Sequence, residues 1–201
     1  MKKNLSELVF ILDKSGSMHG FEADTVGGFN AMIEKQRGEE GEALVTTYLF
    51  NTSYEMLHDR VPLNDIEAMT VKSFRVGGCT ALYDTVGAAI EHIEMIHKYV
   101  RKDDVPEHTI FVISTDGLEN ASRRFGLASV KKMIEKKKND GWEFIFLGAN
   151  IDVKAVADDM GIPADSAMAY EQTKGGIESA YCVMSEAISM RRRRANDKQE
   201  D

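Results

Sequence analysis

The chain alternates short runs of apolar, β-branched and aromatic residues with longer segments of helical periodicity. The apolar runs cover residues 8–12, 108–114 and 143–147. The helical segments among them cover residues 25–36, 82–101 and 127–138. Runs of this length fit strands that are buried on both faces, and helices between them are typical of parallel α/β sheets. The alternation therefore predicts an α/β fold with a mostly parallel central sheet.

One part of the chain departs from this order. Residues 44–50 and 54–60 each alternate apolar with polar side chains and are separated by only three residues, which predicts an antiparallel hairpin at an edge of the sheet. The segment 66–70 could form a short helix. The remaining expected elements are a helix at 153–160, a short strand at 167–170 and a last helix at 176–192.

The length of 201 residues predicts one domain, which we place at residues 1–190. Residues 191–201 form a charged C-terminal tail that begins with four arginines. Positive charge at the end of a helix complements the negative end of the helix dipole, and this is our first interpretation of the arginines. A weak contact with nucleic acid or with an acidic partner is the alternative.

Charge and composition exclude several classes of protein. The net charge of −8 argues against a general nucleic-acid role, because phosphate contacts need a basic surface. No stretch approaches 18 apolar residues, so no membrane role is expected. The apolar run at 8–12 is too short for a signal peptide, and two cysteines are too few for a disulfide scaffold. These features together predict a cytoplasmic location.

The first apolar run ends in a loop that is rich in oxygen donors. Asp13, Ser15 and Ser17 occupy alternate positions, and Gly16 allows the loop to bend sharply between the serines. Open α/β folds place their ligand sites at the carboxyl ends of the strands, where this loop begins. One carboxylate and two hydroxyls that converge there suit a hard cation such as Mg²⁺.

Two further loops bring oxygen donors to the same edge. Asp116 follows the central strand, so it faces Asp13 if the two strands are neighbours, and a divalent ion would remove the repulsion between these carboxylates. Thr80 lies in a glycine-rich loop before the long helix and can add a hydroxyl. Asp84 and the pair Glu119-Asn120 also fall at this edge, and we expect them to surround the site.

These pieces resemble the metal-ion-dependent adhesion site of the von Willebrand factor A domain family. The family's DxSxS motif is present as Asp13, Ser15 and Ser17, its central threonine as Thr80 and its later aspartate as Asp116. The order of elements over residues 5–190 is also similar. The resemblance implies a Rossmann-like, doubly wound fold with helices on both faces of the sheet. It also implies that these five residues hold Mg²⁺, with Mn²⁺ or Ca²⁺ as alternative ions.

The resemblance also implies a function in binding. In this family a carboxylate from a protein partner typically fills an open position on the metal, so the chain is expected to be a non-enzymatic, metal-dependent protein-binding module. Members of the family act in adhesion or in intracellular assembly, the latter often alongside AAA+ ATPases. The absence of an export signal favours an intracellular adaptor or assembly role, with a protein that presents Asp or Glu as the partner.

Two other interpretations remain open. A magnesium-dependent phosphatase of the haloacid-dehalogenase type would use Asp13 as nucleophile, with Ser114 and the pair Asp158-Asp159 as further site residues. That family needs a second aspartate two positions after the first, and this chain has Ser15 there, which cannot act as a general acid near neutral pH. The other interpretation is a structural subunit with a vestigial metal site.

Overall fold

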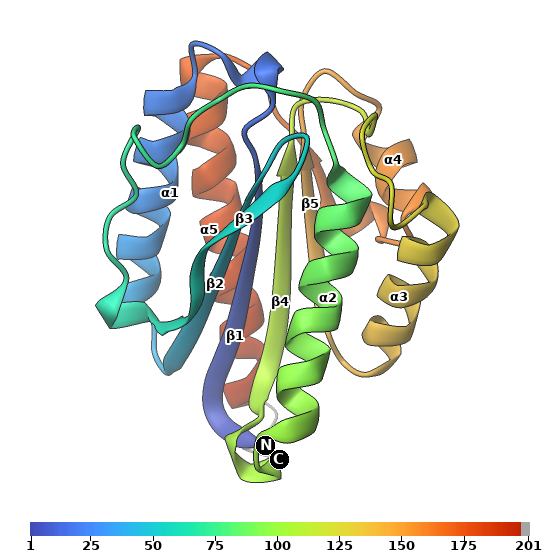
Figure 1. Cartoon of the computed structure of the whole chain (residues 1–201). Coiled ribbons are helices and arrows are strands. Elements are labelled where there is room, and N and C mark those ends of the chain that lie inside the picture. The colour runs from blue at the N-terminus through green and yellow to red at the C-terminus, as the bar shows by residue number, and fades with distance from the viewer. Residues whose placement is uncertain (198–201) are drawn as a thin grey trace.

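A six-stranded sheet forms the centre of the protein in the computed structural model, which describes residues 1–197 (Figure 1). The strands are β1 (Lys2–Asp13), β2 (Glu42–Phe50), β3 (Tyr54–Pro62), β4 (Pro106–Thr115), β5 (Glu143–Gly148) and β6 (Ala167–Ala169). Their order in the sheet is β3-β2-β1-β4-β5-β6, and all neighbours are parallel except β2 and β3. The predicted mostly parallel sheet with one antiparallel edge hairpin is therefore confirmed.

Five helices cover the two faces of this sheet. They are α1 (Glu22–Arg37), α2 (Leu82–Tyr99), α3 (Leu127–Asn139), α4 (Val153–Asp159) and α5 (Lys174–Asp197). Helices α1 and α5 pack on one face, while α2, α3 and α4 pack on the other (Figure 1). This arrangement is the α/β fold that the alternation of apolar runs and helical segments predicts, with the doubly wound topology that the family resemblance implies.

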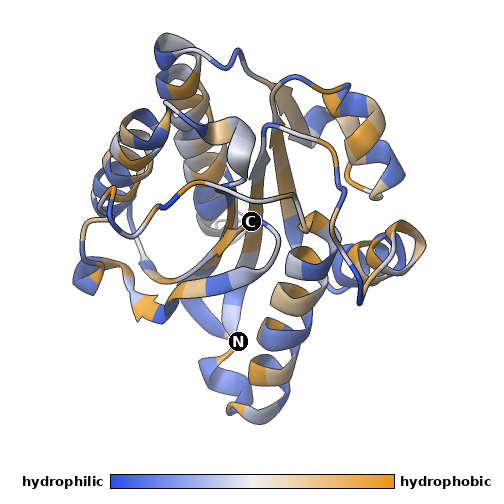
Figure 2. Cartoon of the chain, turned by 45° about the horizontal axis from the view of Figure 1, so that its top comes forward, coloured by the Kyte–Doolittle hydropathy of each residue, from blue (hydrophilic) through white to orange (hydrophobic). Residues whose placement is uncertain are grey.

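Each central strand is apolar along its whole length because both of its faces are covered. In β1, Leu8, Phe10 and Leu12 belong to the hydrophobic cluster with α1 and α5, whereas Val9 and Ile11 belong to the cluster with α2 and α3. Successive side chains of a strand point to opposite faces, so one run supplies both clusters. Figure 2 brings the carboxyl ends of the strands forward and shows that the hydrophobic residues lie in the interior of the fold.

The edge strand β3 is irregular. Its pairing with β2 shifts register twice, between Val45 and Tyr48, and Arg60 has a φ of +49°. The Arg60 guanidinium turns inward and donates to the fully buried Glu7 carboxylate at 2.9 and 3.2 Å. This contact links the edge strand to β1 and stabilises an otherwise unfavourable backbone conformation.

The segment 66–70, which could have formed a helix, is an irregular loop. The side-chain amide of Asn30 makes two hydrogen bonds to the backbone of Met69, at 2.8 and 2.9 Å. The Arg37 guanidinium donates to the carbonyl oxygen of Ile66 at 2.6 Å. Ile66 and Met69 are both buried in the core. Side chains of α1 thus satisfy the backbone groups that a helix would have paired, so packing overrides the local pattern.

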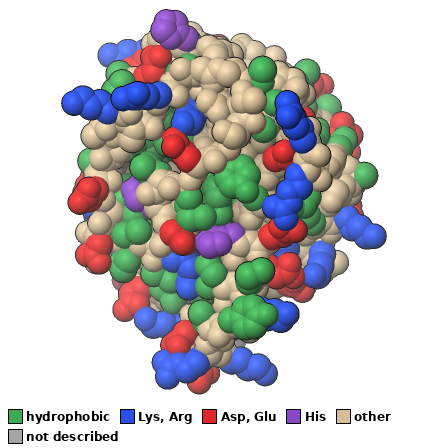
Figure 3. All heavy atoms as spheres, in the orientation of Figure 1, with side chains coloured by type: hydrophobic (Ala, Val, Ile, Leu, Met, Phe, Trp, Pro, Cys, Tyr) green, Lys and Arg blue, Asp and Glu red, His purple; other side chains and the backbone are tan. Residues whose placement is uncertain are grey.

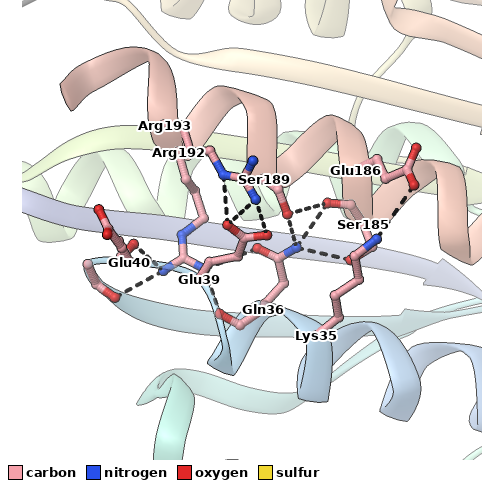
Figure 4. A network of polar contacts seen from close by, with 10 residues as sticks. Lys35, Gln36, Glu39, Glu40, Ser185, Glu186, Ser189, Arg192 and Arg193 are labelled. Carbon is pink, nitrogen blue, oxygen red and sulfur yellow. Dashed lines mark hydrogen bonds and ion pairs between the residues drawn. The ribbon is translucent and has the colours of Figure 1, made fainter. Parts of the chain in front are cut away.

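The last helix is longer than predicted, because α5 continues to Asp197 instead of ending at Arg192. The side chain of Gln36 on α1 lies against Ser185, Ser189 and Arg192 of α5, and we call these four residues the polar seam (Figure 4). The Arg192 guanidinium donates to the Gln36 carbonyl oxygen at 2.9 Å and to the Gly41 carbonyl oxygen at 3.1 Å. Residues 191–193 therefore belong to a packed helix, while 198–201 of the expected tail lie outside the described residues.

The contacts of these arginines differ from the expected complement to the helix dipole. Arg191 pairs with Glu143, Arg192 is buried against carbonyl groups at the end of α1, and Arg193 forms a bidentate pair with Glu39 (Figure 4). The positive charges thus join α5 to other elements instead of lying free at its end.

The surface carries both signs of charge. On the face drawn in Figure 3, acidic and basic side chains are scattered around a group of hydrophobic side chains near the centre. Tyr54 and Met56 of β3 are among the exposed large hydrophobic residues of the molecule. Within residues 1–197, no helix combines the length and apolar character that crossing a membrane would require.

The polar seam gives the first prediction. Arg192→Ala should lower the free energy of unfolding by about 3 kcal/mol, because the buried Gln36 side-chain oxygen loses its donor and the packing between α1 and α5 loses a buried side chain. Arg193→Ala is the matched control: its side chain is 64% exposed, and loss of its pair with Glu39 should cost less than about 1 kcal/mol. Urea denaturation of the three proteins measures both values, and equal losses would contradict a special role for Arg192.

Candidate metal centre

The parallel pairing of β1 with β4 places their carboxyl ends side by side. Leu12 pairs with Ser114, so Asp13 and Thr115 are neighbours across the ladder. The Thr115 hydroxyl donates to one oxygen of the Asp13 carboxylate at 2.7 Å, and the Ser15 backbone N–H donates to the other at 2.7 Å. Asp13 is therefore held from both sides at the end of its strand.

Ser15, Ser17 and Asp116 form a second group directly beside Asp13. The two serine hydroxyl oxygens are 3.0 Å apart, and the Ser17 hydroxyl donates to the Asp116 carboxylate at 2.7 Å. The Ser15 hydroxyl lies 3.5 Å from the same carboxylate oxygen. Asp13, Ser15 and Asp116 are only 2–3% exposed, whereas Ser17 is exposed and lies at the mouth of the site.

Thr80 approaches this group from the loop before α2. A Cβ atom on Gly117 would lie 3.9 Å from both the Thr80 and the Ser17 hydroxyl oxygens, so these two hydroxyls flank the same glycine. The Asn120 side chain accepts from the Thr80 backbone N–H at 2.8 Å, and the Asn120 N–H donates to the Thr80 carbonyl at 3.0 Å. The structure thus brings all five predicted residues to one edge of the sheet.

The glycines of this loop allow close packing against the hairpin. Gly78 has a φ of +81°, and a Cβ at this position would lie 2.6 Å from the Thr52 hydroxyl oxygen. That hydroxyl accepts from the Cys79 backbone N–H at 2.9 Å. A side chain at position 78 would therefore push apart the loop and the hairpin tip that fix Thr80.

The expected surrounding residues hold the loops and do not enter the site. The Asp84 carboxylate accepts three backbone N–H groups from residues 123–125, at 2.7–2.8 Å. The Glu119 carboxylate accepts from the backbone of Tyr83, at 2.9 Å, and of Ser122, at 2.7 Å. With Asn120, these contacts tie the loop after Asp116 to the start of α2, which keeps Thr80 and Asp116 in fixed relative positions.

Gln172 is a site residue that the sequence reasoning missed. It comes from the loop between β6 and α5, and its side-chain amide donates to Asp116 at 2.6 Å and to the Ser17 carbonyl at 3.0 Å. Its own amide oxygen accepts from the Asn150 side chain. No local motif marks Gln172, because its role comes from a contact across 56 residues. Thr115 was also missed, although its place in Ser-Thr-Asp beside a strand end was a usable signal.

The environment of Asp13 disfavours its charged form. Burial is the main cause that raises the pKa of this carboxyl from its ordinary value of 3.8 to about 6, and the charge of Asp116 acts in the same direction. Hydrogen bonds from Thr115 and Ser15 act in the opposite direction but do not outweigh burial. The donors to the two aspartates are neutral hydroxyl, amide and backbone groups, so a cation would add the missing positive charge.

The donor set fits a hard divalent cation. Two carboxylates and three hydroxyls supply only oxygen, which Mg²⁺, Mn²⁺ and Ca²⁺ prefer, and one or two carboxylates are usual for Mg²⁺. In the described part of the chain, no group of three or more His, Cys, Asp or Glu side chains is placed to hold a metal ion. This edge of the sheet therefore does not provide the nitrogen or sulfur ligands that a softer metal ion prefers.

The phosphatase interpretation is not supported by the geometry. Ser15 stands where that chemistry needs a second aspartate, and its hydroxyl lies within the group formed with Ser17 and Asp116. Asp158 and Asp159 lie exposed at the end of α4. Among the contacts of residues 1–197, neither of these carboxylates hydrogen-bonds to a residue of the candidate site.

Comparisons with known proteins place the fold but not the family. No family model matches the chain, and no curated protein matches it in sequence. The von Willebrand factor domain of the type V pilus tip protein Mfa5 from Porphyromonas gingivalis matches in structure with a TM-score of 0.66 and 10% identity, over 92% of this chain and 95% of that one.

Two longer proteins contain a similar unit. The pilus adhesin SpaC from Lactobacillus rhamnosus GG matches with a TM-score of 0.67 and 11% identity, over 94% of this chain and 30% of SpaC. Proximal thread matrix protein 1 from the mussel byssus, with a zinc-occupied MIDAS motif, matches with a TM-score of 0.61 and 12% identity, over 94% of this chain and 47% of that one. The chain thus spans about half or less of these two proteins, and it shares with all three the fold of von Willebrand factor A domains.

The pKa of Asp13 gives the second prediction. Above about pH 6 its charge lowers the stability of the metal-free fold by about 3 kcal/mol, and this cost falls as the pH drops toward 4, because the folded chain takes up the proton first. With a chelator present, Asp13→Asn should therefore be more stable than the unmodified chain at pH 7.5, by about 1–3 kcal/mol. The advantage should shrink below about 1 kcal/mol at pH 4.5.

Paired urea titrations of both proteins at the two pH values measure this change. Taking the difference between the proteins removes the contributions of groups that titrate in both. A stability difference that does not depend on pH would contradict the raised pKa.

Proposed function

We propose that this chain is a non-enzymatic protein-binding module whose binding depends on a divalent metal ion, with Mg²⁺ as the ion. Asp13, Ser15, Ser17, Thr80 and Asp116 hold it. The observation that carries the proposal is the convergence of two buried carboxylates and three hydroxyls at the carboxyl edge of the sheet, with only neutral donors to the carboxylates. Mn²⁺ and Ca²⁺ share the preference for oxygen and are the alternative ions.

The five residues orient the ion toward the partner. Asp13, Ser15 and Asp116 are buried below the mouth of the site, whereas Ser17 is exposed there. When bound, the metal supplies positive charge at this mouth, which attracts an Asp or Glu carboxylate of the partner protein. Gln172 and Thr115 keep the two aspartates in position from the other side.

The compared structures support a role in binding. SpaC is described as a pilus adhesin, and the mussel protein carries zinc at its MIDAS motif. For this chain we propose an intracellular adaptor or assembly role, with an AAA+ ATPase system as a candidate partner. Its two cysteines, Cys79 and Cys182, are free thiols, which is consistent with a reducing cytoplasm.

Metal titration tests the proposal directly and gives the third prediction. Mg²⁺ or Mn²⁺ titrated into metal-stripped protein in a calorimeter should bind at about one ion per chain. Asp116→Ala should weaken this binding more than about tenfold, because it removes one of the two carboxylates. Asp158→Ala is the matched control, since this exposed carboxylate on α4 lies outside the site, and it should bind the ion normally.

Partner capture then tests the dependence on metal. Protein retained from a cell extract with Mg²⁺ should be released by a chelator and should not bind to Asp116→Ala. Absence of saturable metal binding in the unmodified chain would favour a structural subunit with a vestigial site. Steady hydrolysis of a generic phosphate ester that Asp13→Asn abolishes would instead favour the phosphatase.

A further inference from the structure

A hollow of about 330 Å³ lies beside the metal loop, and we call it the basic hollow. Three basic residues line it: Lys14, Lys72 and Arg75. Glu55, Met56 and Leu57 of β3 and Ser73 complete the lining. The Leu57 side chain lies on the face of the sheet that packs against α1, whereas Met56 pairs with Tyr48 and points to the opposite face. The hollow thus combines basic side chains with one partly buried apolar side chain, Leu57.

The charges in the basic hollow do not balance. Lys14 pairs with Glu55, and its side chain is largely covered. Lys72 and Arg75 are both exposed, and neither forms an ion pair with any residue in the described part of the chain. The Arg75 side chain donates only to the Lys72 carbonyl oxygen, at 3.3 Å. Two positive charges therefore remain uncompensated on a chain whose net charge is −8.

Backbone contacts connect the basic hollow to the candidate metal centre. Lys14 follows Asp13 directly, and its carbonyl oxygen accepts from the Gly77 N–H at 2.9 Å. Gly16 in turn donates to the Gly78 carbonyl at 3.0 Å. These two backbone hydrogen bonds join the loop that carries Lys72 and Arg75 to the metal loop. In Figure 1 this loop runs over the top of the fold and leads into α2.

Leu57 distinguishes the basic hollow from a simple anion site. It is half-buried and packs against the core. An occupant that contacts both the basic side chains and Leu57 needs negative charge and some aliphatic surface, and Glu and Asp side chains in a peptide supply both. A nucleic acid would meet the negative charge of the rest of the molecule, which disfavours a long polyanion.

We propose that the partner binds through an extended acidic segment with two anchoring points. One carboxylate of the segment meets the metal, and a second acidic residue pairs with Lys72 and Arg75 while the adjoining chain covers Leu57. This inference rests on the proposed metal-dependent function for its first anchor only. Complementary charge at the second anchor adds selectivity for acidic segments and speeds their association.

Binding of a labelled hexaglutamate peptide tests the second anchor. Its affinity is measured by fluorescence anisotropy with Mg²⁺ and again with a chelator, against an equally labelled hexaglutamine peptide. Lys72→Glu with Arg75→Glu reverses the two free charges of the basic hollow. Lys3→Glu with Lys102→Glu makes the same change in net charge at the opposite end of the strands, where both lysines are exposed. Metal titration of each variant shows whether the first anchor is intact.

The unmodified chain should bind hexaglutamate and not hexaglutamine. The variant of the basic hollow should bind it at least about tenfold more weakly while keeping its metal affinity, and the control variant should stay within about twofold. With the chelator, binding should weaken but keep its dependence on Lys72 and Arg75. That dependence would persist even if the chain held no metal, so failure of the proposed function and failure of this inference give different results.

Three outcomes would overturn the inference. The first is no preference of the unmodified chain for hexaglutamate over hexaglutamine. The second is an equal loss of affinity in the two charge-reversed variants, which would show a general effect of net charge. The third is binding of hexathymidylate that matches the peptide in strength and in dependence on Lys72 and Arg75, which would assign the basic hollow to nucleic acid.

Discussion

Two like charges placed side by side at the carboxyl edge of the sheet govern this structure. The pairing of β1 with β4 brings Asp13 beside Thr115 and Asp116, and both aspartates are almost fully buried. Their hydrogen-bond donors are Ser15, Ser17, Thr115 and Gln172, and all of these donor groups are neutral. Such donors orient the carboxylates but do not cancel their charge. Burial, with a smaller contribution from the charge of Asp116, therefore raises the pKa of Asp13 despite the hydrogen bonds from Thr115 and Ser15. Keeping two buried carboxylates this close lowers the stability of the metal-free fold, and it preserves the candidate metal centre.

Rigid loops make that arrangement possible. The five residues of the candidate metal centre come from three separate loops, and the loops of Thr80 and Asp116 are fixed by contacts outside the site. Asn120 holds Thr80 by its backbone, Asp84 and Glu119 fix the loop after Asp116, and the hairpin tip supports Thr80 from the other side. Favourable packing elsewhere in the fold therefore offsets the unfavourable free energy of placing two carboxylates together, as is usual for functional sites.

Much of the fold was predictable because the strongest signals are local. The buried runs marked the central strands, and the residues directly after them marked the edge where Asp13 and Asp116 meet. The failures have one cause, which is contact between distant segments. Asn30 and Arg37 hold 66–70 out of a helix, and carbonyl groups at the end of α1 bind the Arg192 guanidinium, which was expected to complement the dipole of its own helix. Gln172 reaches Asp116 across the fold, and a one-dimensional pattern does not record that contact.

Both outer strands of the described sheet are poor templates for another strand. β3 shifts register twice and carries Arg60 in a left-handed conformation, and β6 has only three residues. Natural sheets use irregular or short edges of this kind to avoid pairing with other chains. Neighbouring copies therefore find little regular backbone to extend, which protects the protein from growth into fibres in a crowded solution. Any assembly that the chain joins then depends on side-chain contacts and not on backbone pairing between strands. A few substitutions can therefore change which partner it binds.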